Sequence, residues 1–151
     1  MRIGVISDTH GLLRPEALTA LAGSNLILHA GDVGSAEVLD ALAAIAPVHA
    51  VRGNNDRGAW AESLPETREI SVDELRLLLI HNLKELADDP ARRYRVVISG
   101  HSHRPAALER AGILYLNPGS AGPRRFRLPV SIAQLRISRG RVRHEIVTLV
   151  P

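Results

Sequence analysis

Residues 2–34 read RIGVISDTHGLLRPEALTALAGSNLILHAGDVG and decide the fold. The short β-branched run at 2–7 predicts a buried strand, and residues 25–29 predict a second one. Between them, residues 15–22 predict a helix with Pro15 in its first turn and Gly23 just past its end. A strand, a crossover helix and a second strand predict parallel pairing in one sheet.

The same alternation continues to residue 52. Ser35 is expected to cap a second helix that runs to about Ala46 and ends before Pro47, because the residue preceding a proline disfavours the helical region. Residues 48–52 predict a third strand. The β-α-β-α-β order favours a sheet that is covered on both faces.

The second half of the chain favours hairpins. Too many strands are expected for one small sheet, so we predict an α/β (α+β) fold of two packed, mixed β-sheets flanked by helices, in one domain over residues 1–151. The expected elements are a hairpin of strands 67–71 and 75–80, a short helix near 83–89, and strands at 95–99, 106–110, 112–117, 130–137 and 141–148.

Composition narrows the function classes. The absence of cysteine excludes disulfides and thiolate zinc sites. The net charge is +3, and the basic residues are scattered apart from knots at Arg92-Arg93 and Arg124-Arg125-Arg127, so nucleic acid is an unlikely partner. No apolar run reaches the ~18 residues of a membrane span. A cytoplasmic protein without a membrane partner is expected, and the late hairpins leave a sheet edge on which a homo-oligomer could form.

Five polar clusters each follow an apolar run. In α/β sheets, ligands bind beyond the carboxyl ends of the strands, so these clusters are expected to meet at one rim. They supply two carboxylates, one amide oxygen and four imidazoles, a donor set that suits two divalent transition-metal ions. The clusters are Asp8-Thr9-His10, Gly31-Asp32, Gly53-Asn54-Asn55-Asp56, His81 and Gly100-His101-Ser102-His103.

The ordered set resembles that of the calcineurin-like metallophosphoesterases, in particular their small single-domain phosphodiesterase branch in bacteria and archaea. This resemblance implies a four-layer αββα sandwich with a dinuclear site. It also implies a metal-dependent phosphodiesterase acting on a small-molecule phosphoester, with a metal-bridging hydroxide as nucleophile. By the same resemblance Asp32 bridges both ions, and the remaining ligands divide into Asp8, His10 and His103 for one ion and Asn54, His81 and His101 for the other. Manganese is the first expectation, with nickel, iron, cobalt or zinc as alternatives.

The sequence departs from the family pattern at two positions. Many members carry a histidine after the metal-binding asparagine, where it acts as an acid near the leaving group, and Asn55 takes that catalytic place here. An amide donates a hydrogen bond but delivers no proton at neutral pH, so poor leaving groups should turn over slowly. Asn82 follows His81 where the family usually has glycine, so the loop at His81 is expected to differ.

For several residues near the predicted ligands, the sequence leaves more than one role open. His29 and Asp56 are predicted to support the ligands from behind, and His29 is equally well a core histidine. Arg52, Arg57 and the Asn117–Ser120 loop could contact substrate, whereas Trp60 is more typical of packing. Two other functions compete: a phosphomonoesterase, or a non-catalytic interaction module such as the retromer scaffold built on this fold. All seven ligand positions are kept, which favours catalysis.

Overall fold

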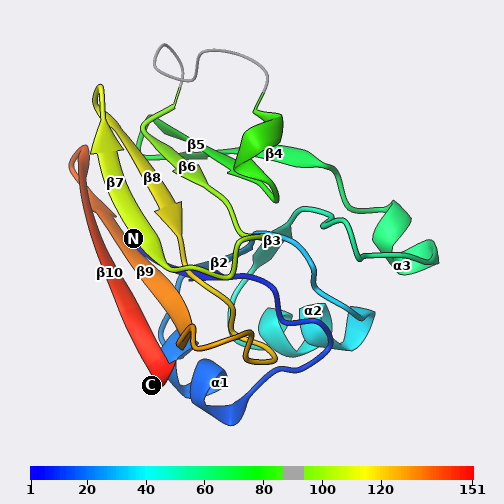
Figure 1. Cartoon of the computed structure of the whole chain (residues 1–151). Helices are drawn as coiled ribbons and strands as arrows, with labels where there is room; N and C mark the ends of the chain where they lie inside the picture. The colour runs from blue at the N-terminus through cyan, green and yellow to red at the C-terminus, as the bar shows by residue number, and fades with distance from the viewer. Residues whose placement is uncertain (87–93) are drawn as a thin grey trace.

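The computed structural model describes residues 1–86 and 94–151 (Figure 1). Two five-stranded sheets pack face to face, and helices flank them. The first half contains β1 (Arg2–Ile6), α1 (Pro15–Leu21), β2 (Leu26–His29), α2 (Ala36–Ala43), β3 (Val48–Ala50) and α3 (Ala59–Glu62). The second half contains β4 (Thr67–Val72), β5 (Leu75–Ile80), the 3-10 turn η1 (Leu83–Glu85), β6 (Val96–Ile98), β7 (Ala106–Arg110), β8 (Ile113–Asn117), β9 (Val130–Ser138) and β10 (Arg141–Val150).

The first sheet has the order β10-β9-β1-β2-β3. β1, β2 and β3 pair in parallel, with Ile6 opposite His29 and His29 opposite Ala50, which confirms the β-α-β-α-β prediction. β9 returns antiparallel to β1 and continues into the β10 hairpin. The carboxyl ends of β1, β2 and β3 therefore meet at one edge of this sheet.

The second sheet has the order β4-β5-β6-β8-β7 and is also mixed. β4 with β5 and β7 with β8 form antiparallel hairpins, whereas β5, β6 and β8 run parallel. The parallel strands β5 and β6 end at Ile80 and Ile98, directly before His81 and the Gly100–His103 cluster.

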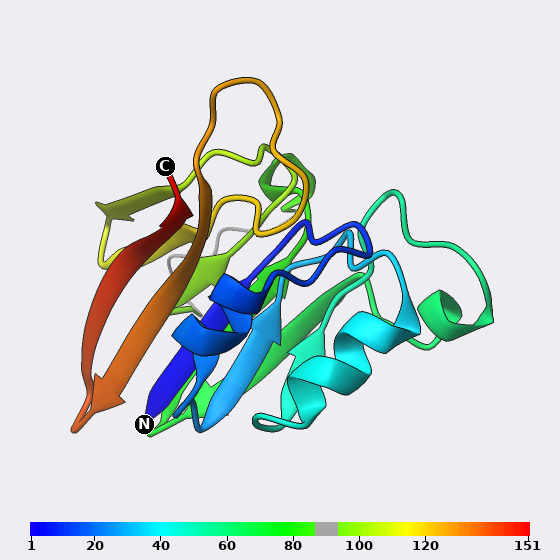
Figure 2. The same ribbon diagram turned by 90° about the horizontal axis from the view of Figure 1, so that it is seen from below.

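The main core lies between the two sheets, where alternate strand residues such as Val5 and Leu28 pack against Leu79 and Ile98. A second cluster joins α1 and α2 to the other face of the first sheet, and Figure 2 shows both helices on that face. Burying one aliphatic side chain of this size stabilises the fold by about 1.5–3 kcal/mol. The two clusters together hold the first sheet from both sides, so its strand ends form a rigid edge.

Local boundaries differ from the sequence prediction in a few places. α2 ends at Ala43 because the chain tightens after it, with the amide of Ile45 bonding the Leu42 carbonyl at 2.9 Å. Ser35 occupies the N-cap position but its side chain makes no capping hydrogen bond. The four-residue α3 was not predicted, since so short a segment carries no helical periodicity.

The outer face of the second sheet also carries apolar side chains. Leu78, Ile80 and Val97 lie there, and Leu86 and Tyr94 pack against them. Of the helix predicted near 83–89, the described residues form the turn η1, and the remainder lies outside the described part of the chain. Among the described residues, no helix is both long enough and apolar enough to cross a lipid bilayer.

Candidate metal centre

The loops that follow β1, β2, β3, β5 and β6 bring all seven predicted ligand residues to one rim. Short distances between side-chain donor atoms link them into a continuous chain. Parallel strands with adjacent carboxyl ends explain the convergence, because each loop leaves its sheet at the same edge.

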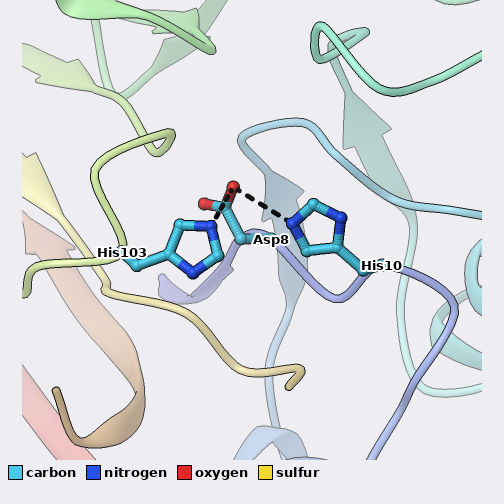
Figure 3. Close-up of side chains that lie close together, drawn as sticks. All are labelled: Asp8, His10 and His103. Atoms are coloured by element: carbon cyan, nitrogen blue, oxygen red, sulfur yellow. Dashed lines mark ion pairs between the residues drawn. The ribbon is translucent and has the colours of Figure 1, made fainter. Parts of the chain in front are cut away.

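Asp8, His10 and His103 form the first group of donors. The Oδ1 atom of Asp8 lies 3.4 Å from Nε2 of His103 and 3.9 Å from Nε2 of His10. Figure 3 shows the two rings on either side of the carboxylate, both turned toward it. One donor atom from each residue lies within 4.8 Å of the others, a spacing that a single cation can bridge.

Asp32 connects this group to the second. Its Oδ2 atom lies 3.7 Å from Nε2 of His10 and 3.3 Å from Nε2 of His81. The Oδ1 atom of Asn54 then lies 3.0 Å from Nε2 of His81 and 3.2 Å from Nδ1 of His101. Asp32 thus stands between the two groups, in the position predicted for a ligand shared by two ions.

The backbone sets the tautomer of His81. Its Nδ1 atom lies 2.7 Å from the Ala30 carbonyl, which can only accept, so Nδ1 carries the hydrogen and donates it. In the neutral ring, Nε2 is left as a lone pair that faces the oxygens of Asp32 and Asn54. Either a proton on Nε2 or a metal ion can link the ring to these oxygens, and a backbone carbonyl behind the ring is the usual support of a metal-binding histidine.

Asp8 also has a buried polar atom without a partner. Its Oδ2 atom accepts hydrogen bonds from the Ser7 hydroxyl at 2.7 Å and the His101 amide at 3.1 Å. Its Oδ1 atom is buried and, among the described residues, has no hydrogen-bond partner, and Nε2 of His10 is in the same condition. Burial raises the pKa of Asp8, although the Ser7 hydrogen bond opposes this shift. A cation between these atoms would satisfy both, so the donor set fits a metal.

The pKa of Asp32 is shifted in the opposite direction to that of Asp8. Burial acts to raise its pKa, but hydrogen bonds with His81 and with the Asn55 amide outweigh burial and hold the pKa well below its usual range. In the reverse direction, burial acts to lower the pKa of His81, and the hydrogen bond with Asp32 raises it above its ordinary value. The carboxylate is therefore charged and preorganised at neutral pH.

Asn55 is directed at this carboxylate. Its backbone amide donates to Oδ1 of Asp32 at 2.9 Å, and its side-chain amide donates to Oδ2 at 3.1 Å. The position of Asn55 near the leaving group, which the sequence predicts, stays a prediction. The structure places its amide group on the central carboxylate, where it holds Asp32 in position.

His29 lies beneath the rim and is fully buried. The Gly31 amide donates to its Nδ1 at 3.1 Å, so Nε2 carries the hydrogen and donates to the Thr9 hydroxyl at 3.0 Å. That hydroxyl donates in turn to the Val33 carbonyl at 2.7 Å. Burial lowers the pKa of His29 to about 3, so the neutral ring ties the loop after β1 to the loop after β2.

Asp56 makes a second tie behind the ligands. Its Oδ2 accepts from the amides of Val33 at 3.1 Å and Gly53 at 2.9 Å, and its Oδ1 accepts from Gly34 at 3.0 Å. The carboxylate joins the loop after β3 to the loop after β2. It fixes the relative position of these two loops, which is the supporting role that the sequence predicts for it.

The ligand loops are backbone-strained. Left-handed φ angles occur at the five predicted ligands Asp8, His10, Asp32, His101 and His103. Residues with a Cβ atom rarely adopt this region, and such strain concentrates at functional sites. Gly100 serves a related need, since a Cβ there would collide with the Ser7 hydroxyl and with Asp8. Glycine at this position therefore allows the two loops to approach each other closely.

The sequence did not single out some supporting groups. Ser7 and Thr9 hold Asp8 and His29, and Ser102 accepts from the Asn117 side chain at 3.1 Å. Asn117 also donates to the Gly100 carbonyl at 3.0 Å, so the Asn117–Ser120 loop anchors the histidine loop. The adjacency of Ser7 to Asp8 was visible in the sequence, but common residues next to a motif give no distinct signal.

A cavity of about 420 Å³ opens beside Asn54, His81 and His101. Arg52 and Arg57 also line it, and Arg52 pairs with Glu66 at 3.3 Å. Trp60 packs against the helix-side core, which confirms the packing interpretation. The cavity gives a substrate access to the second group of donors.

Comparison with known proteins agrees with this geometry. Residues 1–140 match the family model described as a calcineurin-like phosphoesterase superfamily domain. A probable metallophosphoesterase of Methanothermobacter thermautotrophicus is 39% identical over 97% of this chain and 92% of that protein. A phosphodiesterase of Methanocaldococcus jannaschii is 28% identical over 79% of this chain and 83% of that protein.

A solved structure is also similar. Wild-type Vps29 of Entamoeba histolytica, crystallised with zinc, has a TM-score of 0.78 and 25% identity, and the match covers 99% of both chains. The match to the family model covers most of the chain, and the donor residues lie where the family resemblance predicts a metal site. The chain belongs to the calcineurin-like phosphoesterase superfamily.

Proposed function

We propose that this protein is a phosphodiesterase that requires two divalent metal ions. The observation that carries the proposal is the chain of seven donor residues, in which Oδ1 of Asp8 and Nε2 of His10 are buried and have no hydrogen-bond partner among the described residues. Buried polar atoms without a partner are costly, and a cation relieves that cost. The family membership and the phosphodiesterase relative support the same class of reaction.

We assign the donor residues to two ions as the family resemblance implies. Asp8, His10 and His103 would hold one ion, Asn54, His81 and His101 would hold the other, and Asp32 would serve both. When bound, such a pair of ions lowers the pKa of a coordinated water, which becomes the nucleophile, and offsets the charge of the phosphoester. The mixed nitrogen and oxygen donors suit manganese, nickel, iron, cobalt or zinc, and affinity order alone does not choose among these metals.

The residues of this chain hold the predicted ligands in position, and they offer the leaving group little general acid catalysis. Asn55 donates to Asp32 through both its backbone and its side chain, and it carries no proton that it could deliver to a leaving group. Good leaving groups do not need that proton. We therefore expect aryl diesters to react faster than alkyl esters and alkyl monoesters.

Two alternatives use the same fold. A phosphomonoesterase would need efficient protonation of poor leaving groups, which Asn55 does not provide. A non-catalytic interaction module is suggested by the likeness to Vps29. The complete donor set of this chain favours catalysis, but the zinc complex of Vps29 means that hydrolysis, and not metal binding alone, separates the two functions.

Hydrolysis of bis-p-nitrophenyl phosphate tests the proposal. Protein stripped with a chelator should be inactive, and Mn²⁺ should restore activity together with about two bound ions per chain, measured by elemental analysis. An alkyl phosphomonoester should react much more slowly. Equal rates on both substrates would favour the monoesterase, and inactivity with every transition metal tried would favour the interaction module.

A further inference from the structure

The Arg124–Arg127 segment is one of the basic knots of the sequence, and the proposed reaction does not use it. It lies in the loop between β8 and β9. Phe126 is 86% exposed, the highest value among the large apolar side chains of the described residues. The amide of Leu128 bonds the Arg125 carbonyl at 3.2 Å, so Phe126 and Arg127 form the corner of a closed turn.

Phe126 is an unfavourable residue for this position. Its φ angle is +56°, and turns with a positive φ at their second residue normally have glycine, asparagine or aspartate there. A bulky residue in the left-handed region is strained, and an exposed phenyl ring gains nothing from burial. Positions where local preferences are violated without a folding benefit are expected at functional sites.

The loop that carries Phe126 is fastened to the metal centre. The Ser120 hydroxyl donates to the Asp8 carbonyl at 3.1 Å, and the Ala121 amide donates to the Ser7 carbonyl at 3.0 Å. Gly122 packs so closely on the Thr9 carbonyl that a Cβ atom would not fit. Figure 2 shows the loop (orange) projecting at the edge where the loop after β1 (dark blue) also lies. The base of the loop, residues 120–122, is therefore fixed against the residues around Asp8, and the turn projects from it.

Positive charge surrounds the exposed ring. Arg104, Phe126, Arg127 and Leu128 line a hollow of about 710 Å³. Arg104 directly follows His103 and also lines the neighbouring hollow that contains His101, so it connects the turn to the candidate ligands. Within residues 1–86 and 94–151, no carboxylate forms an ion pair with Arg104, Arg125 or Arg127.

We propose that Phe126, Arg104 and Arg127 form a subsite for a nucleotide-type phosphodiester, in which a nucleobase stacks on Phe126 and a further phosphate lies between the two arginines. Stacking on an aromatic side chain tolerates every base, because each has a π face. Arginine pairs with phosphate through its planar fork. The inference rests on the proposed phosphodiesterase function, since it assigns the arm of the substrate that is not cleaved away.

Two diesters with the same p-nitrophenyl leaving group isolate this arm. One is methyl p-nitrophenyl phosphate, and the other is the p-nitrophenyl ester of thymidine 5′-monophosphate. The chemistry at phosphorus is matched, so a difference in kcat/KM reports recognition of the nucleoside. We expect the metal-loaded protein to prefer the thymidine ester roughly tenfold, the gain that stacking of one base supplies.

Phe126→Gly should remove this preference without damaging the fold. Glycine accepts the positive φ, so the melting temperature should be unchanged or slightly higher. The kcat/KM for the methyl ester should stay as in the wild type, and that for the thymidine ester should fall roughly tenfold. Arg139→Gly is the matched control, because Arg139 is an exposed residue with φ +52° in the β9–β10 turn. It should leave both kcat/KM values unchanged.

A 3′-phosphate on the thymidine ester tests the arginines. We expect the added phosphate to raise kcat/KM severalfold, and Arg127→Gln to abolish that gain while the gain from the base remains. The control Arg110→Gln removes an exposed arginine at the end of β7, outside the hollow, and should preserve the gain.

Failure of the proposed phosphodiesterase function and failure of the proposed subsite give different results. If neither diester is hydrolysed with any metal, the proposed function is wrong. If both are hydrolysed at equal kcat/KM, or if Phe126→Gly lowers both rates alike, the phosphodiesterase stands and the subsite is wrong. Loss of activity with a lowered melting temperature in Phe126→Gly would assign the ring a structural role and would also overturn the subsite.

Discussion

Apart from Phe126, the left-handed non-glycine residues of the described chain lie in two kinds of place, and the two differ in what the backbone strain achieves. In the β4–β5, β7–β8 and β9–β10 turns they are Asp73, Glu74, Ala111 and Arg139, whose function is to reverse the chain. At the rim they are Asp8, His10, Asp32, His101 and His103, whose side chains direct donor atoms toward the other predicted ligands. The hairpin turns use backbone strain to join strands, whereas the rim uses it to aim side chains.

Burial separates the two regions further. The hairpin residues are exposed or lie at strand ends, so their side chains interact mostly with water. At the rim Asp8, Asp32 and His103 are buried. Hydrogen bonds from neighbouring loops fix Asp8 and Asp32. Strain and buried charge together mean that the rim is maintained at a cost to stability, which only a bound ligand would offset.

The largest difference is expected for Asp32→Asn, compared with Asp73→Asn in the β4–β5 turn. Both residues are aspartates at positive φ, so the backbone effect is matched. Loss of the shared carboxylate should lower kcat/KM on an aryl diester roughly 10³-fold, about 4 kcal/mol of transition-state stabilisation. Asp73→Asn should leave the rate unchanged. Steady-state kinetics with metal analysis would check this, and equal rates in the two variants would remove Asp32 from the site.

The metal-free protein should lose stability as pH falls below 6.5. His29 has an ordinary pKa of 6.5 and a folded pKa of about 3, so between these values the unfolded chain binds a proton that the folded chain does not. Stability is then fully present above pH 6.5 and declines toward pH 3, by roughly 1 kcal/mol per pH unit. Denaturant unfolding at several pH values measures the slope.

His29→Asn should flatten that slope, although it lowers stability at neutral pH by removing the ties to Thr9 and Gly31. His144→Gln, on the exposed β10 strand of the hairpin, controls for the loss of a histidine. If the slope of His29→Asn matched that of the wild type, His29 would not be the buried neutral group of the rim.

A smaller effect is expected for Asn55→Ala. The variant loses the side-chain hydrogen bond to Asp32 and keeps the backbone one, so kcat/KM should fall roughly tenfold. Asn25→Ala is the control, since that side chain accepts from the Arg2 amide at the opposite end of β1. A full loss of activity only on poor leaving groups would return Asn55 to the leaving-group role that the sequence predicts.

The smallest change should come from Asp73→Gly. Glycine relieves the left-handed strain of the turn but adds freedom to the unfolded chain, so the free energy of unfolding should rise by no more than about 0.5 kcal/mol. Activity should not change. A clear decrease in stability, measured by thermal unfolding, would mean that the Asp73 side chain supports the hairpin and that the two regions are less different than proposed.

Much of the fold followed from the order of apolar runs. β1, β2 and β3 were predicted with their parallel pairing, because strand, crossover helix and strand leave few alternatives. The four-residue α3 and the early end of α2 were not predicted. Both depend on tight local bonds that apolar periodicity does not report.

The candidate metal site likewise has features that the sequence predicts and features that it does not. The sequence by itself determined which donors are present and that they follow strands, and therefore that Asp8, Asp32 and His81 meet at one rim. Only the tertiary structure decided how they face each other: the Ala30 carbonyl that sets the tautomer of His81, and the turn of Asn55 onto Asp32. It also decided that the loop of Phe126 is fastened beside Asp8. The physical reason is that strand order constrains where a loop begins, whereas the aim of a side chain depends on hydrogen bonds between loops that are distant in the chain.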